Sequence, residues 1–203
     1  EGMLWEPIPS FSGQFKGNGH TISDLTITGQ YSPAGLFGIV EEQGSIESLS
    51  VRGVVSVSDS ADTTTGGIAG INHGTLISCQ FTGVVTGDSE VGGIVGRNES
   101  EGTIDHSTAR AIVTGKSSTG GIAGYNLGAI TGCTNVGSIN TEYPEASLDT
   151  DGFTAKMVDY INNKMAAADD DATNSVTNVA TDTGGIAGRS SGMILTSVNT
   201  GTI

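Results

Sequence analysis

The hydrophobic positions of the chain fall into short blocks enclosed by glycine. In each block two glycines flank an aliphatic residue and a second small or apolar residue, and the arrangement occurs five times. The blocks are Gly35–Gly38, Gly67–Gly70, Gly93–Gly96, Gly121–Gly124 and Gly185–Gly188. Their first glycines are separated by 32, 26, 28 and 64 residues, so the last interval spans about two units and indicates an insertion.

A second hydrophobic pattern follows the blocks. An aliphatic residue is followed three positions later by a small or apolar residue, and the third position of the set comes two residues after that. The sets are Ile46, Leu49, Val51; Leu76, Cys79, Phe81; Ile104, Ser107, Ala109; Ile130, Cys133, Asn135; Ile194, Ser197, Asn199; and, after a glycine turn at 17–20, Ile22, Leu25, Ile27. Six sets with one spacing predict a structural repeat of roughly 26 to 30 residues.

The repeated unit predicts an all-β fold, a parallel β-helix or β-solenoid. Three short β-branched runs between glycine turns cannot bury their own apolar side, so the unit becomes stable only by stacking on the next one. Strands of successive coils would pair in parallel about 4.8 Å apart, which places equivalent residues in columns along the axis. We expect a right-handed coil because parallel crossover connections are nearly always right-handed.

Three columns of equivalent residues are predicted along the coil. The clearest inward column contains Leu36, Ile68, Ile94, Ile122 and Ile186. A column of closing glycines is expected to allow a bend or a close backbone approach that a Cβ atom would block. These glycines are Gly38, Gly70, Gly96, Gly124 and Gly188. Asn72, Asn98 and Asn126 follow the blocks, where stacked amides can satisfy each other and tolerate a left-handed turn.

The repeat is suspended over about residues 141–181, which indicates an insertion within a single solenoid domain spanning 1–203. Phe153, Met157, Ile161 and Met165 lie at four-residue intervals, a spacing typical of an amphipathic helix. We expect this short helix to pack on the solenoid flank, with a partner-binding face as the alternative. The triplet Asp169–Asp171 is interpreted as a solvated helix terminus rather than a cation site, because three consecutive carboxylates do not converge on one ion.

Composition narrows the class of protein and its partners. Thirty-two glycines without a strict period of three exclude collagen, and an apolar fraction of 35% rich in β-branched residues argues against disorder. The 203-residue chain carries a formal charge of −14, which repels nucleic acid and anionic lipid surfaces. No stretch approaches the roughly 20 apolar residues needed to cross a bilayer, so no membrane insertion of this segment is expected.

The ends of the sequence fall inside the repeat pattern. The first residues show no basic segment followed by an apolar one, as a secretion signal would. We expect a mature or excised piece, whose partners include neighbouring repeats of a longer chain.

The two cysteines are predicted to be buried thiols. Cys79 and Cys133 occupy one column position with Ser107 between them, so they lie roughly 9.6 Å apart, whereas a disulfide needs Cα atoms within about 7 Å. The alternative, a reactive thiol, needs a neighbouring base or cation that the column does not offer.

No motif supports catalysis, a metal or a cofactor. His20, His73 and His106 lie in three different contexts, a glycine turn, a post-block turn and a strand. Zinc-binding, nucleophile-elbow and nucleotide-loop motifs are absent from the sequence. We therefore assign no catalytic, cofactor-binding or metal residue and leave the ligand-binding residues unknown.

The strongest enzymatic alternative is a carbohydrate-active β-helix, either a polysaccharide lyase or a glycosidase, and a glycan-binding module is a further one. Such chemistry needs convergent carboxylates in a groove. Arg97 and Arg189 share a repeat position with Ile71 and Tyr125, so no catalytic row is maintained there, and Asp105 aligns only loosely with Glu47. Surface decoration is the favoured interpretation of these residues.

Several of these segments together resemble the GLUG-repeat family. The residues that carry the resemblance are Trp5–Ile8, Phe11–Ile22, Gly35–Gly38 and the later Gly-Gly-Ile-Ala-Gly blocks, and it covers the chain except 141–181. GLUG repeats occur in bacterial surface and secreted proteins, including haemagglutinin-like adhesins and non-catalytic regions of streptococcal immunoglobulin A1 metallopeptidases. The metallopeptidase motif is missing here, so that activity does not transfer.

The resemblance implies a bacterial protein that is secreted or lies at the cell surface. We expect a non-catalytic module for adhesion, ligand display or rigid spacing, with a host or microbial glycan or a surface protein as the ligand.

Overall fold

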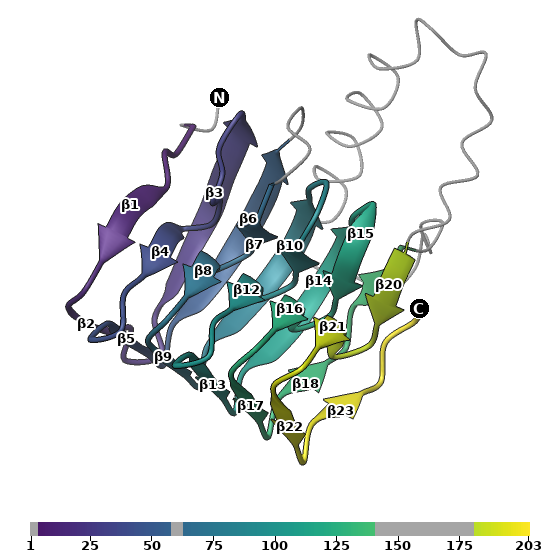
Figure 1. Ribbon diagram of the computed structural model, residues 1–203. Coiled ribbons are helices and arrows are strands. Elements are labelled where there is room, and N and C mark those ends of the chain that lie inside the picture. Colours follow the sequence, from purple (N-terminus) through teal and green to yellow (C-terminus); the bar gives the residue numbers. More distant parts are fainter. Residues whose placement is uncertain (1–3, 58–62, 141–180) are drawn as a thin grey trace, which may run out of the picture. The chain divides into compact units, whose positions relative to one another are not determined.

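The solenoid prediction is confirmed by the computed structural model, which describes residues 4–57, 63–140 and 181–203. These residues form an all-β stack of parallel strands without a helix (Figure 1). The helix expected at 153–165 and the acidic triplet at 169–171 lie outside the described residues. Coil handedness stays a prediction. No helical segment in the described ranges has the length and hydropathy to cross a membrane.

Four sheets run along the stack, and every strand pair in them is parallel. Sheet A contains β1 (Ile8–Phe11), β4 (Phe37–Val40), β8 (Ala69–Asn72), β12 (Val95–Asn98), β16 (Ala123–Asn126) and β21 (Ala187–Ser190). Sheet B contains β2 (Gln14–Lys16), β5 (Ser45–Glu47), β9 (Thr75–Ile77), β13 (Thr103–Asp105), β17 (Ala129–Thr131) and β22 (Met193–Leu195).

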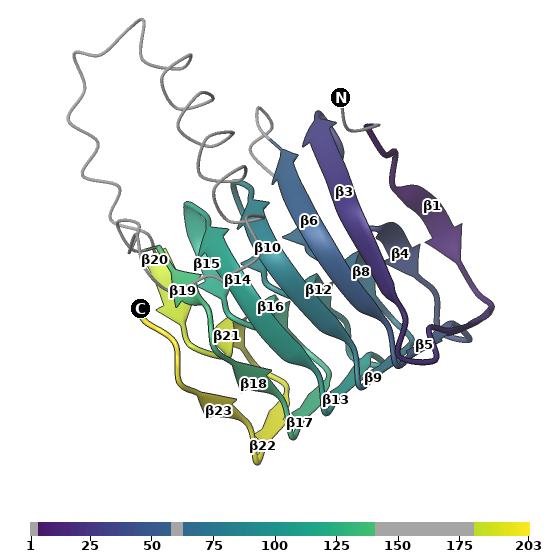
Figure 2. The same cartoon turned by 180° about the vertical axis from the view of Figure 1, so that it is seen from behind.

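Sheet C carries the longest strands and is seen from its outer side in Figure 2. It contains β3 (Thr21–Gly29), β6 (Ser50–Val57), β10 (Gln80–Thr86), β14 (Thr108–Thr114), β18 (Thr134–Asn135), β23 (Val198–Asn199) and the short β19 (Ser138–Ile139), which also pairs with β14. Sheet D contains β7 (Thr65–Gly66), β11 (Val91–Gly92), β15 (Ser117–Gly120) and β20 (Thr181–Gly184).

One coil, called a rung below, takes its strands from the sheets in chain order; the first two rungs use sheets A, B and C, and each later rung begins with a strand of sheet D. The described residues contain six rungs, beginning at β1, β4, β7, β11, β15 and β20. The sequence predicted three runs in each coil, and sheet D is the fourth. Its strands are only two to four residues long and contain the extra glycines Gly66, Gly92, Gly120 and Gly184, so they lack the β-branched run that would have marked them.

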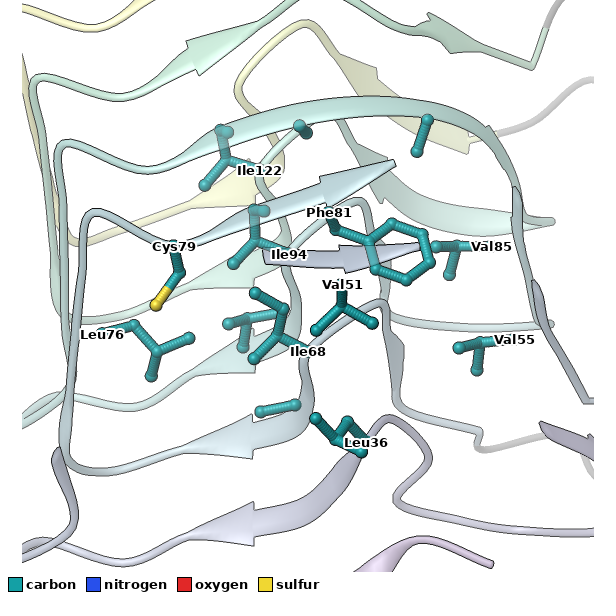
Figure 3. Packing of buried hydrophobic residues seen from close by; sticks show 14 of the residues in the cluster. Leu36, Val51, Val55, Ile68, Leu76, Cys79, Phe81, Val85, Ile94 and Ile122 are labelled. Atoms are coloured by element: carbon teal, nitrogen blue, oxygen red, sulfur yellow. The ribbon is translucent and has the colours of Figure 1, made fainter. Parts of the chain in front are cut away.

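The expected inward column forms the centre of the core. Ile68, Ile94 and Ile122 are fully buried, and the backbone N–H of each donates to the carbonyl of the equivalent residue one rung further on. Figure 3 shows them in one file with Leu36. These residues lie just before the strands of sheet A rather than inside them. Beside this file, Ile46, Leu76, Ile104 and Ile130 pair in register through sheet B.

The block glycines bring opposite sheets of one rung into contact. A Cβ atom on Gly67 would lie 2.3 Å from Cγ of Phe81, and one on Gly121 would lie 2.3 Å from Cγ of Asn135. Closing glycines of the later rungs meet backbone instead: a Cβ atom on Gly124 would lie 2.3 Å from the backbone nitrogen of Val91. The predicted close backbone approach is confirmed at this column.

Left-handed backbone occurs at a corner that the sequence did not indicate. Ser48, Ser78, His106, Gly132 and Thr196 occupy equivalent positions between sheets B and C, with φ between 45° and 60°. The sequence context of His106 suggested a strand, but this residue lies in a turn. Asn72, Asn98 and Asn126 have no positive φ, so the left-handed turn that asparagine can tolerate is not adopted at these positions.

The first rung departs from the predicted alignment. Phe15 pairs with Ile46, whereas Ile22 pairs with Val51 and Leu25 with Gly53. The spacing of Ile22, Leu25 and Ile27 matches the repeat only because the register shifts between Ile22 and Leu25, where Asp24 has a φ of 61°. The set at 22–27 is thus a bulged strand of sheet C and not a sixth copy of the pattern.

Candidate binding surface

One outward column of sheet A changes its chemistry along the stack. Its members are Ser10, Ile39, Ile71, Arg97, Tyr125 and Arg189, paired in register from the first rung to the last. Arg97 and Tyr125 are partly exposed between buried neighbours, and Arg189 is exposed. The predicted shared position of Arg97, Arg189, Ile71 and Tyr125 is confirmed.

The last three members of this column form a cation–π stack. Cζ of Arg97 lies 5.2 Å from the centroid of the Tyr125 ring, and Cζ of Arg189 lies 5.4 Å from it. The two guanidinium groups come from the rungs on either side of Tyr125, so they cover opposite faces of the ring. The faces of Tyr125 are therefore not available to stack on a sugar.

Arg97 is held by carboxylates as well as by the ring. Its guanidinium lies 3.2 Å from Oε1 of Glu90 and 2.9 Å from Oε1 of Glu99. Glu90 also accepts a hydrogen bond of 3.4 Å from the hydroxyl of Thr64 on the preceding rung. This cluster fixes Arg97 in place. Within the described ranges Arg189 has no carboxylate partner, which makes it the cation of this column that is best placed to contact a ligand.

Behind this surface the predicted asparagine ladder is confirmed. Nδ2 of Asn72 donates to Oδ1 of Asn98, and Nδ2 of Asn98 donates to Oδ1 of Asn126, each at 2.8 Å. Asn126 then donates to the hydroxyl of Ser190 at 3.2 Å. Oδ1 of Asn72 is buried without a hydrogen-bond partner, because the apolar Val40 occupies this column one rung earlier.

A second amide pair stands in the interior and was not predicted. Nδ2 of Asn135 donates to Oδ1 of Asn199 at 2.7 Å, and Oδ1 of Asn135 accepts from the backbone N–H of Gly137 at 3.1 Å. The sequence signal for this pair was an asparagine at the third position of the second pattern in two consecutive sets. Their place among apolar residues concealed it, since Val51, Phe81 and Ala109 occupy the same column.

The cysteines are free and buried, as predicted. Desolvation by burial raises the pKa of Cys79 to about 11 and the pKa of Cys133 to about 11. Between them, Ser107 accepts from the backbone N–H of Cys79 at 3.1 Å and donates its own backbone N–H to Sγ of Cys133 at 3.4 Å. The column therefore satisfies backbone groups at the corner, and its thiols stay protonated near neutral pH.

The acidic residues considered for catalysis are better aligned than the sequence suggested. Glu47, Ile77 and Asp105 pair in register on sheet B, so the expectation of only a loose alignment is wrong. Asp105 Oδ1 lies 2.9 Å from Nδ1 of His106. No group of three or more histidine, cysteine or acidic residues in the described ranges is placed to hold a metal ion.

These features define a repeat protein of the parallel β-solenoid class. Residues 87–114 match the family model described as the GLUG motif, which confirms the predicted resemblance for this segment. The matched residues include β11 to β14 and so cover one complete rung.

Two curated proteins share part of this sequence. Over 117 residues the chain is 35% identical to halomucin from Haloquadratum walsbyi, an alignment that covers 54% of this chain and 1% of halomucin. Over 140 residues it is 29% identical to a proposed Gly-rich membrane protein from Evansella cellulosilytica, covering 50% of this chain and 16% of that protein. The chain thus spans a small part of the length of these relatives.

A crystal structure of a proposed immunoglobulin A1 protease from Bacteroides ovatus is also similar. It aligns with 67% of this chain and 65% of its own, at 16% identity and a TM-score of 0.40.

Proposed function

We propose that this chain is a cell-surface or secreted repeat module that works without catalysis, as a rigid spacer whose outer columns display ligand-binding side chains for adhesion. The GLUG motif and the names of halomucin and the Gly-rich membrane protein support the surface location. The ligand classes that we favour are glycans and surface proteins, and no cofactor takes part.

The observation that carries this proposal is the contrast between inward and outward columns. The column of Ile68 is aliphatic from the second rung to the last, whereas the column of Arg97 changes from hydroxyl to aliphatic to cationic to aromatic. A rigid apolar interior with a variable exterior is typical of repeat proteins that bind along a surface. A catalytic site would instead require groups that converge on one point.

A binding screen with one pair of variants tests the proposal. The purified chain would be applied to a glycan array and to a panel of surface proteins, and the affinity for any ligand found would be measured by calorimetry. We expect Arg189→Ala to weaken binding about tenfold, the effect of losing one charge-assisted hydrogen bond. Arg110→Ala is the matched control, because Arg110 is an exposed arginine on the outer side of sheet C.

Two results would contradict this proposal. Equal loss of affinity in the two arginine variants would show that general charge, and not the sheet A column, binds the ligand. Release of products from a glycan by the wild-type chain would overturn the non-catalytic assignment.

The second candidate is a carbohydrate-active enzyme, and one observation favours it. Glu47 and Asp105 stand two rungs apart in one column, roughly 9.6 Å between backbones, which is close to the carboxylate separation of inverting glycosidases. Turnover that is abolished in Asp105→Asn but kept in Asp88→Asn would establish this function, since Asp88 lies outside that column.

A further inference from the structure

Two arginines in the outward column of sheet A have different surroundings. Arg97 lies on β12 and Arg189 on β21, with Tyr125 on β16 between them, and these three strands are neighbours in the sheet (Figure 1). Both guanidinium groups cover the ring of Tyr125. This contact uses the charge of each group, so the N–H donors of both arginines can still bind a carboxylate.

In the fourth rung, Arg97 binds two carboxylates that come from its own rung. Its Nη1 lies 3.2 Å from Oε1 of Glu90, and its Nε lies 2.9 Å from Oε1 of Glu99. Glu90 directly precedes the sheet D strand β11, and Glu99 directly follows the sheet A strand β12. The fold thus has two positions in one rung from which a carboxylate reaches an arginine of this column.

The same two positions exist beside Arg189 in the sixth rung. By the register of sheet D, Asp182 is equivalent to Glu90. Ser191 is equivalent to Glu99, because each of them donates its backbone N–H to the carbonyl of the ladder asparagine one rung earlier. Both positions belong to the described residues, so the comparison of the two arginines does not depend on any coil beyond the sixth.

Neither of the equivalent residues pairs with Arg189. Asp182 has a shorter side chain than Glu90 and a left-handed backbone with a φ of 58°, and no ion pair joins it to Arg189 within the described part of the chain. Ser191 carries a hydroxyl group where Glu99 carries a carboxylate. Arg189 and Ser191 are both exposed, so the place of the second carboxylate is open to a ligand.

We propose that Arg189 binds the carboxylate of an acidic sugar, in the place that Glu99 takes beside Arg97. A guanidinium group can donate to both oxygens of one carboxylate, and the hydroxyl group of Ser191 can exchange a hydrogen bond with a sugar hydroxyl. The formal charge of −14 repels polyanions, which favours a glycan with one carboxylate among many hydroxyl groups over an acidic protein segment. This inference rests on the proposed function, since it names the ligand class of the same column.

Calorimetric titration of the 203-residue chain with two matched ligands tests the inference. The ligands are a trisaccharide that ends in glucuronic acid and the same trisaccharide with that carboxylate converted to an amide. We expect the amide to bind about tenfold more weakly or worse, because its hydrogen bonds to Arg189 lose the assistance of a negative charge. Equal affinities for the two trisaccharides would overturn the inference.

Two variants at one exposed position provide the structural control. Ser191→Glu places a carboxylate at the position equivalent to Glu99, so it should compete with the trisaccharide and weaken binding about tenfold. Ser191→Gln adds a side chain of the same length without the charge and should bind like the wild type. Circular dichroism checks that both variants are folded. An equal loss of affinity in the two variants would overturn the inference, because side-chain size would then explain the loss.

The results separate this inference from the proposed function. Binding of a neutral glycan or of a protein that is lost in Arg189→Ala, without binding of the acidic trisaccharide, would overturn the acidic-sugar inference and support ligand display. A peptide with a single glutamate that binds as tightly as the trisaccharide would overturn the choice of a sugar. A chain that binds no ligand on the array and neither trisaccharide would overturn both ligand display and the inference.

Discussion

The inward column of Ile94 and the outward column of Arg97 belong to the same rungs, but the residue type repeats in the first column and changes in the second. Both columns are strictly in register. In the Ile94 column each aliphatic side chain lies between its equivalents, and an aliphatic residue at each of these positions avoids cavities and unpaired polar groups. Outside, water satisfies any side chain, and serine, isoleucine, arginine and tyrosine follow each other. The residue type therefore repeats in the Ile94 column and varies in the Arg97 column.

The largest effect is expected inside the aliphatic column. Ile94→Ala should lower the free energy of unfolding by about 4 kcal/mol, because a fully buried side chain is lost and the rungs on either side prevent the cavity from collapsing. Ile71→Ala, at the half-buried outward position that pairs with Arg97, should cost about 1 kcal/mol. Urea unfolding of both variants measures the difference, and similar values would remove the contrast between the columns.

The next largest effect concerns the asparagine ladder. Asn98→Leu removes the ladder bond of Nδ2 of Asn72, which keeps the Gly74 carbonyl as an acceptor, and leaves Oδ1 of Asn126 without its ladder donor, so we expect a loss of about 3 kcal/mol. Asn72→Leu removes only one ladder bond and also removes an oxygen that has no partner, so about 1 kcal/mol is expected. Thermal unfolding of the two variants compares these losses. A greater loss for Asn72→Leu would contradict this account of the ladder.

A smaller effect depends on pH. Burial raises the pKa of both thiols from 9.0 to about 11, so the folded chain holds these protons more tightly than the unfolded chain does. Stability is therefore unaffected below about pH 8 and falls as pH rises from 9 to 11, by at most about 2 kcal/mol for each thiol. Urea unfolding at pH 8 and at pH 10.5 measures this loss. The double variant Cys79→Ala and Cys133→Ala should show a flatter profile, and an equal slope would exclude the thiols as the cause.

The smallest effect is expected outside. Tyr125→Ala should cost about 1 kcal/mol or less, since a partly exposed cation–π stack contributes little in water. Tyr125→Phe keeps a ring between the two guanidinium groups and should be nearly neutral. Differential scanning calorimetry of both variants distinguishes the loss of the ring from the loss of the hydroxyl. A loss near that of Ile94→Ala would mean that the outer column helps to fix the fold.

The interior was predictable because a stacked core repeats in the sequence. The file through Ile68, the ladder through Asn98 and the separation of the two thiols all follow from spacing alone. Equivalent positions must meet when strands pair in parallel one rung apart. The glycines were predictable for the same reason, since a repeated glycine marks a place where a side chain would collide.

What was missed depends on backbone conformation and side-chain direction. The bulge at Asp24 gave the first strand of sheet C a spacing that imitates the repeat, although its residues pair elsewhere. The left-handed corner is occupied by serine, histidine, glycine and threonine, which have no common sequence signal. Predicting the cation–π stack requires the directions of two arginine side chains, and a shared column position does not give those directions.

The amide ladder has a constant sense, with every donor reaching toward the following rung. A duplicated coil placed between two existing coils would therefore receive and supply the same bonds as its neighbours. Growth or shortening by whole units then leaves the ladder continuous, and its intervals of 26 and 28 residues show that coils of slightly different length fit the same ladder. Length is in this sense a quantity that gene duplication can adjust freely, while the cross-section of the protein stays fixed.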